Sequence, residues 1–362
     1  MKSVKNIISF LTCVNVFTLI CIGICSAQSI PKLSLLALSK AKHTLSIVDA
    51  STLKVIASVP VGEDPHEVIA SSDGKTAYVS IYGGGNLHTI NVIDLVAQKR
   101  LKDIDTKPLF GPHGLTFVNN KLWFTVEGSK AIGSYNPSTD SIDWCIGTGQ
   151  DRTHMIYVTN DAKKIYTTNV ASGTVSIIQD TLVKQGPMPP PPSGKIEQRK
   201  MQAPPPHMMQ SRHNWHQSVI TVANGSEGFD VSPDSTELWT ASAENGKIYI
   251  IDLSTKKLIQ TVDANVGGAN RLKFTPDGKM VFISSLRSGN LTIYDVKARK
   301  LIKQINIGSG AAGIVMQPDG ARAFVACSPN NYIAVIDLKT LTIINKIDVG
   351  GEPDGLSWAM QP

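Results

Sequence analysis

Short apolar segments recur at a regular interval along the chain, and each is followed by a polar turn. In the clearest of them, an apolar strand ends in an acidic or amide residue. Seven copies can be aligned on that final residue: Asp49, Asp94, Asn136, Gln179, Asp252, Asp295 and Asp337. Successive copies are 45, 42, 43, 73, 43 and 42 residues apart. A nearly fixed period of this length indicates a repeat architecture.

A second recurring feature is a turn rich in Asp, Pro and Gly that precedes another apolar strand. It reads SDGK at 72–75, NDAK at 160–163, SPDS at 232–235, TPDGK at 275–279 and QPDG at 317–320. These residue types are typical of tight turns, because Pro fixes φ, Asp accepts backbone hydrogen bonds and Gly tolerates positive φ. The pattern therefore predicts four short strands in each repeat. One precedes the turn, one follows it, the third ends in Asp, and the fourth is an outer strand. No repeat shows a useful helical period.

Four strands in about 42 residues is the size of one propeller blade. We therefore predict an all-β fold, a seven-bladed β-propeller with four-stranded antiparallel blades, over residues 28–362. The chain begins with the second, third and fourth strands of a blade, at 35–59, and ends with a lone first strand at 355–359. We expect this C-terminal strand to join the N-terminal strands and close the ring.

The long spacing holds an insertion in the fourth blade, which we place at 184–216. Its proline runs, PMPPPP at 187–192 and PPP at 204–206, favour extended conformers and predict a solvated loop. Its second half contains His207, His213 and His216 beside two methionines. These are ligand types that suit copper, but no tight spacing rule supports a metal site, so a flexible linker with solvated histidines is the alternative.

The N-terminus has the pattern of a targeting segment. Lys2 and Lys5 precede an apolar stretch at 7–24, and small residues at 25–27 follow it. This pattern predicts a signal peptide at 1–27, cleaved to give a periplasmic or secreted protein without a transmembrane span in the mature chain. Lipid attachment at Cys21 or Cys25 is the alternative.

Composition and charge add few constraints. Hydrophobic residues make up 42% of the chain and charged residues 18%, as in an ordinary globular protein. The net charge of +6 is spread along the chain without a basic run, so nucleic acid is not expected as a partner. Cys145 and Cys327 fall in non-adjacent blades, so we expect both to be buried and unbridged. A closed ring buries its own edges, which favours a monomer.

Equivalent positions of the repeats predict a polar ring. The residue seven before each turn Asp starts the innermost strand, and these residues should face the central axis at one mouth of the channel. The set is His66, His113, His154, Glu227, Asn270, Ala312 and Asp354. Tyr82, Glu127, Asn169, Arg271 and Arg287 should lie beside it as further ligand-binding candidates.

Three imidazoles on consecutive blades, followed by carboxylates, are the groups used as metal ligands and general bases. His66, His113, His154 and Glu227 are therefore candidate catalytic residues and candidate ligands of a divalent metal ion. The alternative is a polar channel that binds only water, because a repeat can duplicate a histidine without a function. We find no catalytic-triad spacing and no phosphate-binding loop.

Several phrases resemble the YVTN family of bacterial propellers. They are TLKVIA at 52–57, PHEV at 65–68, SDGKTAYVS at 72–80, SGTVSII at 172–178 and EGFDVSPD at 227–234. The resemblance covers nearly all of the mature chain apart from the insertion, and it implies a propeller fold. It implies little about activity, because similar propellers include binding proteins, lactonases and redox enzymes.

Two classes of function remain open from the sequence. The first is an exported binding or interaction scaffold for an unidentified small molecule or protein at the channel mouth. The second is an enzyme, either a metal-dependent hydrolase or lactonase that uses the mouth ring, or a streptogramin-lyase-like protein. The lyase version depends on one blade, with GPHGL at 111–115 and LWFTVE at 122–127, and the other six blades lack that pattern.

Overall fold

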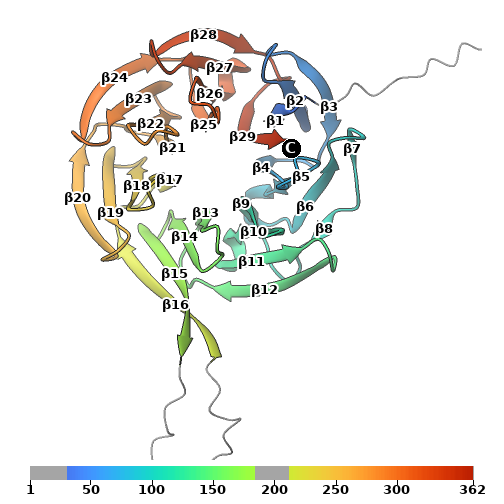
Figure 1. The fold of residues 1–362 in the computed structure, drawn as a ribbon, viewed down its shortest axis with the longest axis vertical. Helices are drawn as coiled ribbons and strands as arrows, with labels where there is room; N and C mark the ends of the chain where they lie inside the picture. Colours follow the sequence, from blue (N-terminus) through green and yellow to red (C-terminus); the bar gives the residue numbers. More distant parts are fainter. Residues whose placement is uncertain (1–30, 184–211, 362) are drawn as a thin grey trace, which may run out of the picture.

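The computed structural model describes residues 31–183 and 212–361, and these form a closed ring of seven antiparallel blades (Figure 1). Blade 1 is shared by the two ends of the chain. Its innermost strand is the C-terminal β29 (Pro353–Met360), followed outwards by β1 (Leu33–Ser39), β2 (Thr44–Asp49) and β3 (Val55–Pro60). Register pairs Leu35 with Trp358. The predicted fold class and the predicted closure of the ring by the C-terminal strand are confirmed.

The other six blades follow in chain order, each running from the centre of the ring outwards. Blade 2 contains β4 (Pro65–Ala70), β5 (Thr76–Ile81), β6 (Thr89–Asp94) and two short outer strands, β7 (Lys99–Arg100) and β8 (Ile104–Asp105). Blade 3 contains β9 (Pro112–Val118), β10 (Lys121–Val126), β11 (Ala131–Asn136) and β12 (Ser141–Gly147). Blade 4 contains β13 (Thr153–Val158), β14 (Lys164–Asn169), β15 (Thr174–Val183) and β16 (Arg212–Thr221).

Blades 5 to 7 repeat the pattern closely. Blade 5 contains β17 (Ser226–Val231), β18 (Glu237–Ser242), β19 (Lys247–Asp252) and β20 (Lys257–Asp263). Blade 6 contains β21 (Ala269–Phe274), β22 (Met280–Ser285), β23 (Asn290–Asp295) and β24 (Lys300–Asn306). Blade 7 contains β25 (Ala311–Met316), β26 (Arg322–Cys327), β27 (Tyr332–Asp337) and β28 (Thr342–Ile347). Three-residue 3-10 turns lie at Gly83–Gly85, Glu127–Ser129 and Ser328–Asn330.

The hydrophobic core lies between blades. Each of the seven apolar clusters joins residues of two neighbouring blades, and the ring that they complete leaves no blade face uncovered. Trp239, Phe282 and Phe324, all on second strands, are fully buried. The outer strands instead alternate between half-buried and exposed positions, as expected for the edge of a sheet. No helix in the described ranges is long and apolar enough to span a membrane.

The repeated aspartates shape the hairpins. The Asp252 carboxylate accepts hydrogen bonds from the Thr255 backbone N–H and from the Ser254 and Thr255 hydroxyls, which bends the chain between the third and fourth strands. In the turn between first and second strands, Asp277 accepts from the Thr275 hydroxyl and from the Lys279 N–H. Both are local side-chain-to-backbone turns, as the sequence predicts.

The insertion leaves the ring from the outer hairpin of blade 4. Strands β15 and β16 pair through ten residues each, and the ribbon projects outwards beyond the neighbouring blades (Figure 1). Residues 212–216, which we placed in the insertion, belong to this ribbon, so the strand pairing extends further than the composition indicates. His207 and the signal peptide lie outside the described residues.

The two cysteines of the described chain are free and far apart in the ring, but their burial differs from our prediction. Cys327 is fully buried as expected. Cys145 is exposed, because it lies on the solvent-facing side of the outer strand β12, where the side chains alternate.

Candidate functional site

Three positions of every blade converge on one mouth of the channel. The first is the second residue of the inner strand. The second lies two residues before it and has a positive φ in all seven blades: Asp64, Gly111, Arg152, Gly225, Gly268, Gly310 and Glu352. The third follows the second strand: Lys40, Tyr82, Glu127, Val170, Ala243, Leu286 and Ser328. In every blade its backbone N–H donates to the carbonyl of the second position, so the same hydrogen bond holds these two positions together around the whole ring.

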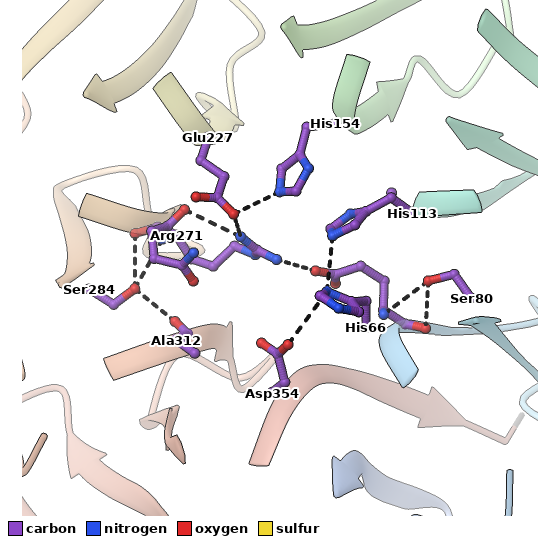
Figure 2. Close-up of polar contacts among 12 residues, drawn as sticks. His66, Ser80, His113, His154, Glu227, Arg271, Ser284, Ala312 and Asp354 are labelled. Atoms are coloured by element: carbon purple, nitrogen blue, oxygen red, sulfur yellow. Dashed lines mark hydrogen bonds and ion pairs between the residues drawn. The ribbon is translucent and has the colours of Figure 1, made fainter. Parts of the chain in front are cut away.

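The predicted ring lies at the first of these positions, and its polar members are brought together (Figure 2). The His113 Nε2 atom lies 3.2 Å from His66 Nδ1, and the rings of His113 and His154 are 3.8 Å apart at their centroids. His154 Nε2 lies 2.8 Å from Glu227 Oε1. These imidazoles come from blades 2, 3 and 4, so the packing of consecutive blades brings them into contact.

His154 is held between two carboxylates. Its Nδ1 meets Glu127 and its Nε2 meets Glu227, so both ring nitrogens must donate, and the ring is an imidazolium. Burial opposes this charge, but the two carboxylates outweigh burial and raise the pKa of His154 above its usual value. Burial alone would raise the pKa of Glu227, but the charges of His154 and Arg271 outweigh burial and hold this pKa far below its usual range. Tyr82 donates to Glu127 from the far side.

His113 has the opposite environment. It is 1% exposed, and burial, followed by the nearby cationic groups, lowers its pKa well below the usual value. It is therefore neutral while its stacked neighbour His154 is charged. Its Nδ1 is buried and has no hydrogen-bond partner among the described residues. An imidazole nitrogen left unpaired in this way costs free energy unless a ligand or water meets it.

A second charged group crosses the channel axis. Arg271, on the inner strand of blade 6, bonds to Glu67 on the inner strand of blade 2, and its Nη1 lies 3.5 Å from Glu227 Oε1. Burial disfavours the Arg271 charge, but Glu67 and Glu227 together raise its pKa above the usual value. This bridge is visible in the middle of Figure 2 and forms the floor of the mouth. It joins two residues that are 204 positions apart in the sequence.

Glycines make room for this bridge. A Cβ on Gly228 would lie 2.6 Å from the Cα of Arg271, and one on Gly355 would lie 2.9 Å from the Cα of Glu67. Both distances are shorter than real carbon contacts allow. The residue after the ring position is therefore Gly in blades 5 and 1, and the bulky bridging residue stands in the next blade. The same position is Gly in blades 3 and 7, where a Cβ on Gly114 or Gly313 would lie 2.5 Å from His154 O or 2.2 Å from Asp354 O, so close approach of the inner strands requires glycine there too.

Above the floor lies a cavity of about 340 Å³. Its charged lining includes Lys40, whose Nζ lies 2.8 Å from Asp354 Oδ2 and 3.0 Å from His66 Nε2. Burial lowers the pKa of His66, although Asp354 and Asp64 oppose the shift. Leu286, Ala312 and Pro329 are the apolar part of the lining.

Some predicted site residues lie elsewhere. Asn169 is fully buried inside blade 4, where its amide bonds to Thr174 and Ser176. Arg287 is exposed and does not line the cavity. His216 is exposed on β16, and His213 pairs through its backbone with Leu182, so neither joins the mouth. No group of three or more His, Cys, Asp or Glu side chains within 31–183 and 212–361 is arranged to hold a metal ion.

Sequence reasoning missed five charged residues of the site: Lys40, Asp64, Glu67, Arg152 and Glu352. The signal for Lys40 was present, because it follows its second strand as Tyr82 and Glu127 follow theirs. Asp64 and Arg152 occupy the positive-φ position that is Gly in four other blades. Glu67 had no such signal, since its role depends on Arg271 across the channel.

Comparison with known proteins supports the fold more than any activity. A model of the cytochrome D1 heme domain matches residues 204–321, about a third of the chain. No curated protein matches the sequence. A functionally unknown protein from Desulfotomaculum acetoxidans DSM 771 has a similar structure, with a TM-score of 0.67 and 11% identity over 91% of this chain and 99% of that one.

Two further solved structures are similar at the level of the fold. A candidate 6-phosphogluconolactonase from Bacteroides fragilis NCTC 9343 gives a TM-score of 0.66 and 16% identity over 90% of this chain and 97% of that one. Hydrazine synthase from Kuenenia stuttgartiensis gives 0.62 and 15% over 81% and 88%.

A heme does not fit the described mouth. The bridge between Glu67 and Arg271 crosses the channel, and both nitrogens of His154 are engaged by carboxylates. The three imidazoles also lie outside residues 204–321, the part that matches the heme-domain model. We therefore derive no chemistry through a heme.

Proposed function

We propose that this chain is an exported YVTN-type propeller that binds a small polar ligand at the channel mouth. The observation that carries the proposal is Asn270 Oδ1, a buried polar atom on a residue that lines the cavity and that has no partner in the described chain. Buried polar groups in native proteins are almost always hydrogen-bonded, so this orphan acceptor indicates that something binds in the cavity.

A second feature supports the proposal. Asp64, Arg152 and Glu352 adopt positive φ at positions where four other blades have Gly. Positive φ is less favourable for residues other than Gly. The described chain has fourteen further non-Gly residues at positive φ, so the point of interest here is that all three mouth residues are charged. The chain thus keeps charged groups at the mouth where glycine would fit the backbone better.

A screen of small polar molecules by thermal shift tests this proposal. Leu286→Trp should block the cavity without harming the fold, because Leu286 lines the cavity and is 47% exposed. Leu301→Trp is the matched control, since Leu301 is 54% exposed on the outer strand β24. Compounds that stabilise the wild type and the control, but not Leu286→Trp, would support binding at the mouth. Equal stabilisation of both variants would place the ligand elsewhere.

The second candidate function is hydrolysis, and the contrast between the two stacked imidazoles favours it. Neighbouring groups with opposite pKa shifts can serve as a base and an acid. In lactone opening, neutral His113 would take the proton of the attacking water, and charged His154 would give a proton to the leaving alkoxide as the ring C–O bond breaks. Both rings are buried and neither lines the cavity, so this step requires the mouth to open around them. Turnover of glucono-1,5-lactone that is lost in His113→Asn would favour this function over binding alone.

The divalent metal expected from the histidines stays a prediction. Elemental analysis of the purified mature chain tests it directly. Stoichiometric metal that disappears in His113→Ala or His154→Ala would assign it to the mouth. Loss only on deletion of residues 184–211 would assign it to the insertion.

A further inference from the structure

The mouth cavity has more unpaired hydrogen-bond acceptors than unpaired donors. Within the described chain no donor meets Glu227 Oε2, Asp354 Oδ1 or the Glu352 carboxylate, although all three residues line the cavity. The buried Asn270 Oδ1 is a fourth acceptor without a partner, on a residue that is 5% exposed. Acceptors therefore outnumber free donors, and a complementary ligand must bring its own N–H or O–H groups.

The two cationic side chains of the cavity are already engaged. Lys40 is bonded to Asp354 and His66, and Arg271 is bonded to Glu67 and lies beside Glu227. The lining thus holds three carboxylates, Glu227, Glu352 and Asp354, against two cations. Nearby, Glu67 and Glu127 add two negative charges, and His154 and Arg152 add two positive charges, which leaves one net negative charge. The mouth is locally negative on a chain whose net charge is +6, so it favours a positively charged ligand.

The cavity also has an apolar side. Leu286, Ala312 and Pro329, from blades 6 and 7, line the same cavity as the carboxylates, and Leu286 is 47% exposed. Contact between this exposed leucine and an apolar part of a ligand would favour binding, by about 25 cal/mol per Å² of apolar surface removed from water. A ligand with one charged end and one apolar end would satisfy both sides.

We infer that the mouth cavity binds a small organic ammonium ion, with its N–H groups on Glu227, Asp354 and Asn270 and its apolar body against Leu286 and Pro329. The inference rests on the proposed function and narrows it to a ligand class. It also gives a reason for Glu352, whose side chain has no partner in the described chain and whose backbone adopts a φ of 45°.

Three probes that share one ring separate charge from shape: cyclohexylammonium, cyclohexanol and cyclohexanecarboxylate. Each is titrated calorimetrically into the mature protein. We expect the ammonium to bind about tenfold tighter than the alcohol at about 0.02 M ionic strength, and the carboxylate weakest. Raising the ionic strength to about 0.5 M should shrink the advantage of the ammonium and leave the alcohol unchanged.

Glu352→Gln is the most specific variant, because it removes a charge and breaks no contact within the described chain. It should lower the affinity for the ammonium about three- to tenfold and leave the affinity for the alcohol unchanged. Glu63→Gln is the matched control, since Glu63 is an exposed glutamate next to Asp64 that does not line the cavity. Leu286→Trp should abolish binding of the ammonium and the alcohol.

Equal affinity for the ammonium and the alcohol, or tightest binding of the carboxylate, would overturn the inference. The same holds if no probe binds to folded protein, or if the ammonium binds equally well to Glu352→Gln. The proposed function is tested separately, by whether any polar compound in the thermal-shift screen stabilises the wild type but not Leu286→Trp. Failure of the ligand class and failure of the site are therefore distinguishable.

Discussion

Replacing Arg271 by Met removes the charge that bridges the channel and keeps most of the side-chain volume. The side chains of Arg271 and Glu67 are 8% and 11% exposed, so Glu67 would be left as a nearly buried, unpaired carboxylate. Breaking a buried pair from one side costs about 3–5 kcal/mol. The direct attraction at an effective dielectric of 20 is of similar size, about 4 kcal/mol at 4 Å.

Removing both charges should destabilise the protein much less than removing the Arg271 charge alone. In the double variant Glu67→Gln with Arg271→Met no unpaired carboxylate remains, and Glu227 keeps its contact with His154. Replacement of a buried ion pair by uncharged groups is often close to neutral, so we expect the double variant within about 2 kcal/mol of wild type. The single variant should therefore be rescued by the second substitution.

Thermal denaturation measures the effect. For a domain of this size 1 kcal/mol corresponds to roughly 1.5 °C, so Arg271→Met should lower Tm by roughly 4–8 °C. Lys102→Met is the control, because it breaks an ion pair in which Lys102 is 82% exposed, and no measurable change is expected. A change below about 1 °C in Arg271→Met, or a double variant as unstable as the sum of the singles, would refute the buried bridge.

Five further predictions rest on the same structure. His154, whose pKa is raised on folding, adds stability below about pH 6.5 that is lost as the pH rises through its folded pKa, so His154→Gln should flatten the decline of Tm on the alkaline side. His113, whose pKa is lowered, loses its contribution as the pH falls below about 6.5, so His113→Gln should flatten the acid side. Glu352→Gly should raise stability by up to about 1 kcal/mol in denaturant unfolding while weakening ammonium binding; a loss of stability would contradict the strain argument. Gly228→Ala should cost about 1–3 kcal/mol, because its Cβ would lie 2.4 Å from Asn270 O, whereas Gly147→Ala has open space and should be neutral. Deleting residues 353–362 should prevent soluble folding, since blade 1 would lose its inner strand; a soluble, cooperatively melting deletion variant would contradict ring closure.

The fold could be predicted from the sequence because each repeat carries its own signals. The turn aspartates and the strand-ending aspartates act on neighbours within a few residues, so their chemistry is visible locally. The seven-fold count and the shared blade 1 followed from spacing alone. The burial of Cys145 was predicted wrongly, because a two-residue alternation on an edge strand does not tell which side faces solvent.

The site was predictable only in part, for a related reason. Repeat alignment assigns His66, His113, His154 and Glu227 to one level of the ring, since equivalent positions must meet at the axis. It cannot predict that His154 takes a carboxylate on each side, because Glu127 comes from a different position of a different blade. The bridge from Arg271 to Glu67 joins opposite sides of the ring, and no local pattern encodes such a pairing.

The protonation states of the stacked imidazoles test the site most directly, because they depend on the whole network being assembled from five blades. Imidazole ¹⁵N chemical shifts of the mature protein at neutral pH report them residue by residue. We expect His113 to show one protonated and one bare nitrogen, and His154 to show both nitrogens protonated. A neutral His154 or a charged His113 at that pH would contradict the network, and with it the ligand site that we place above it.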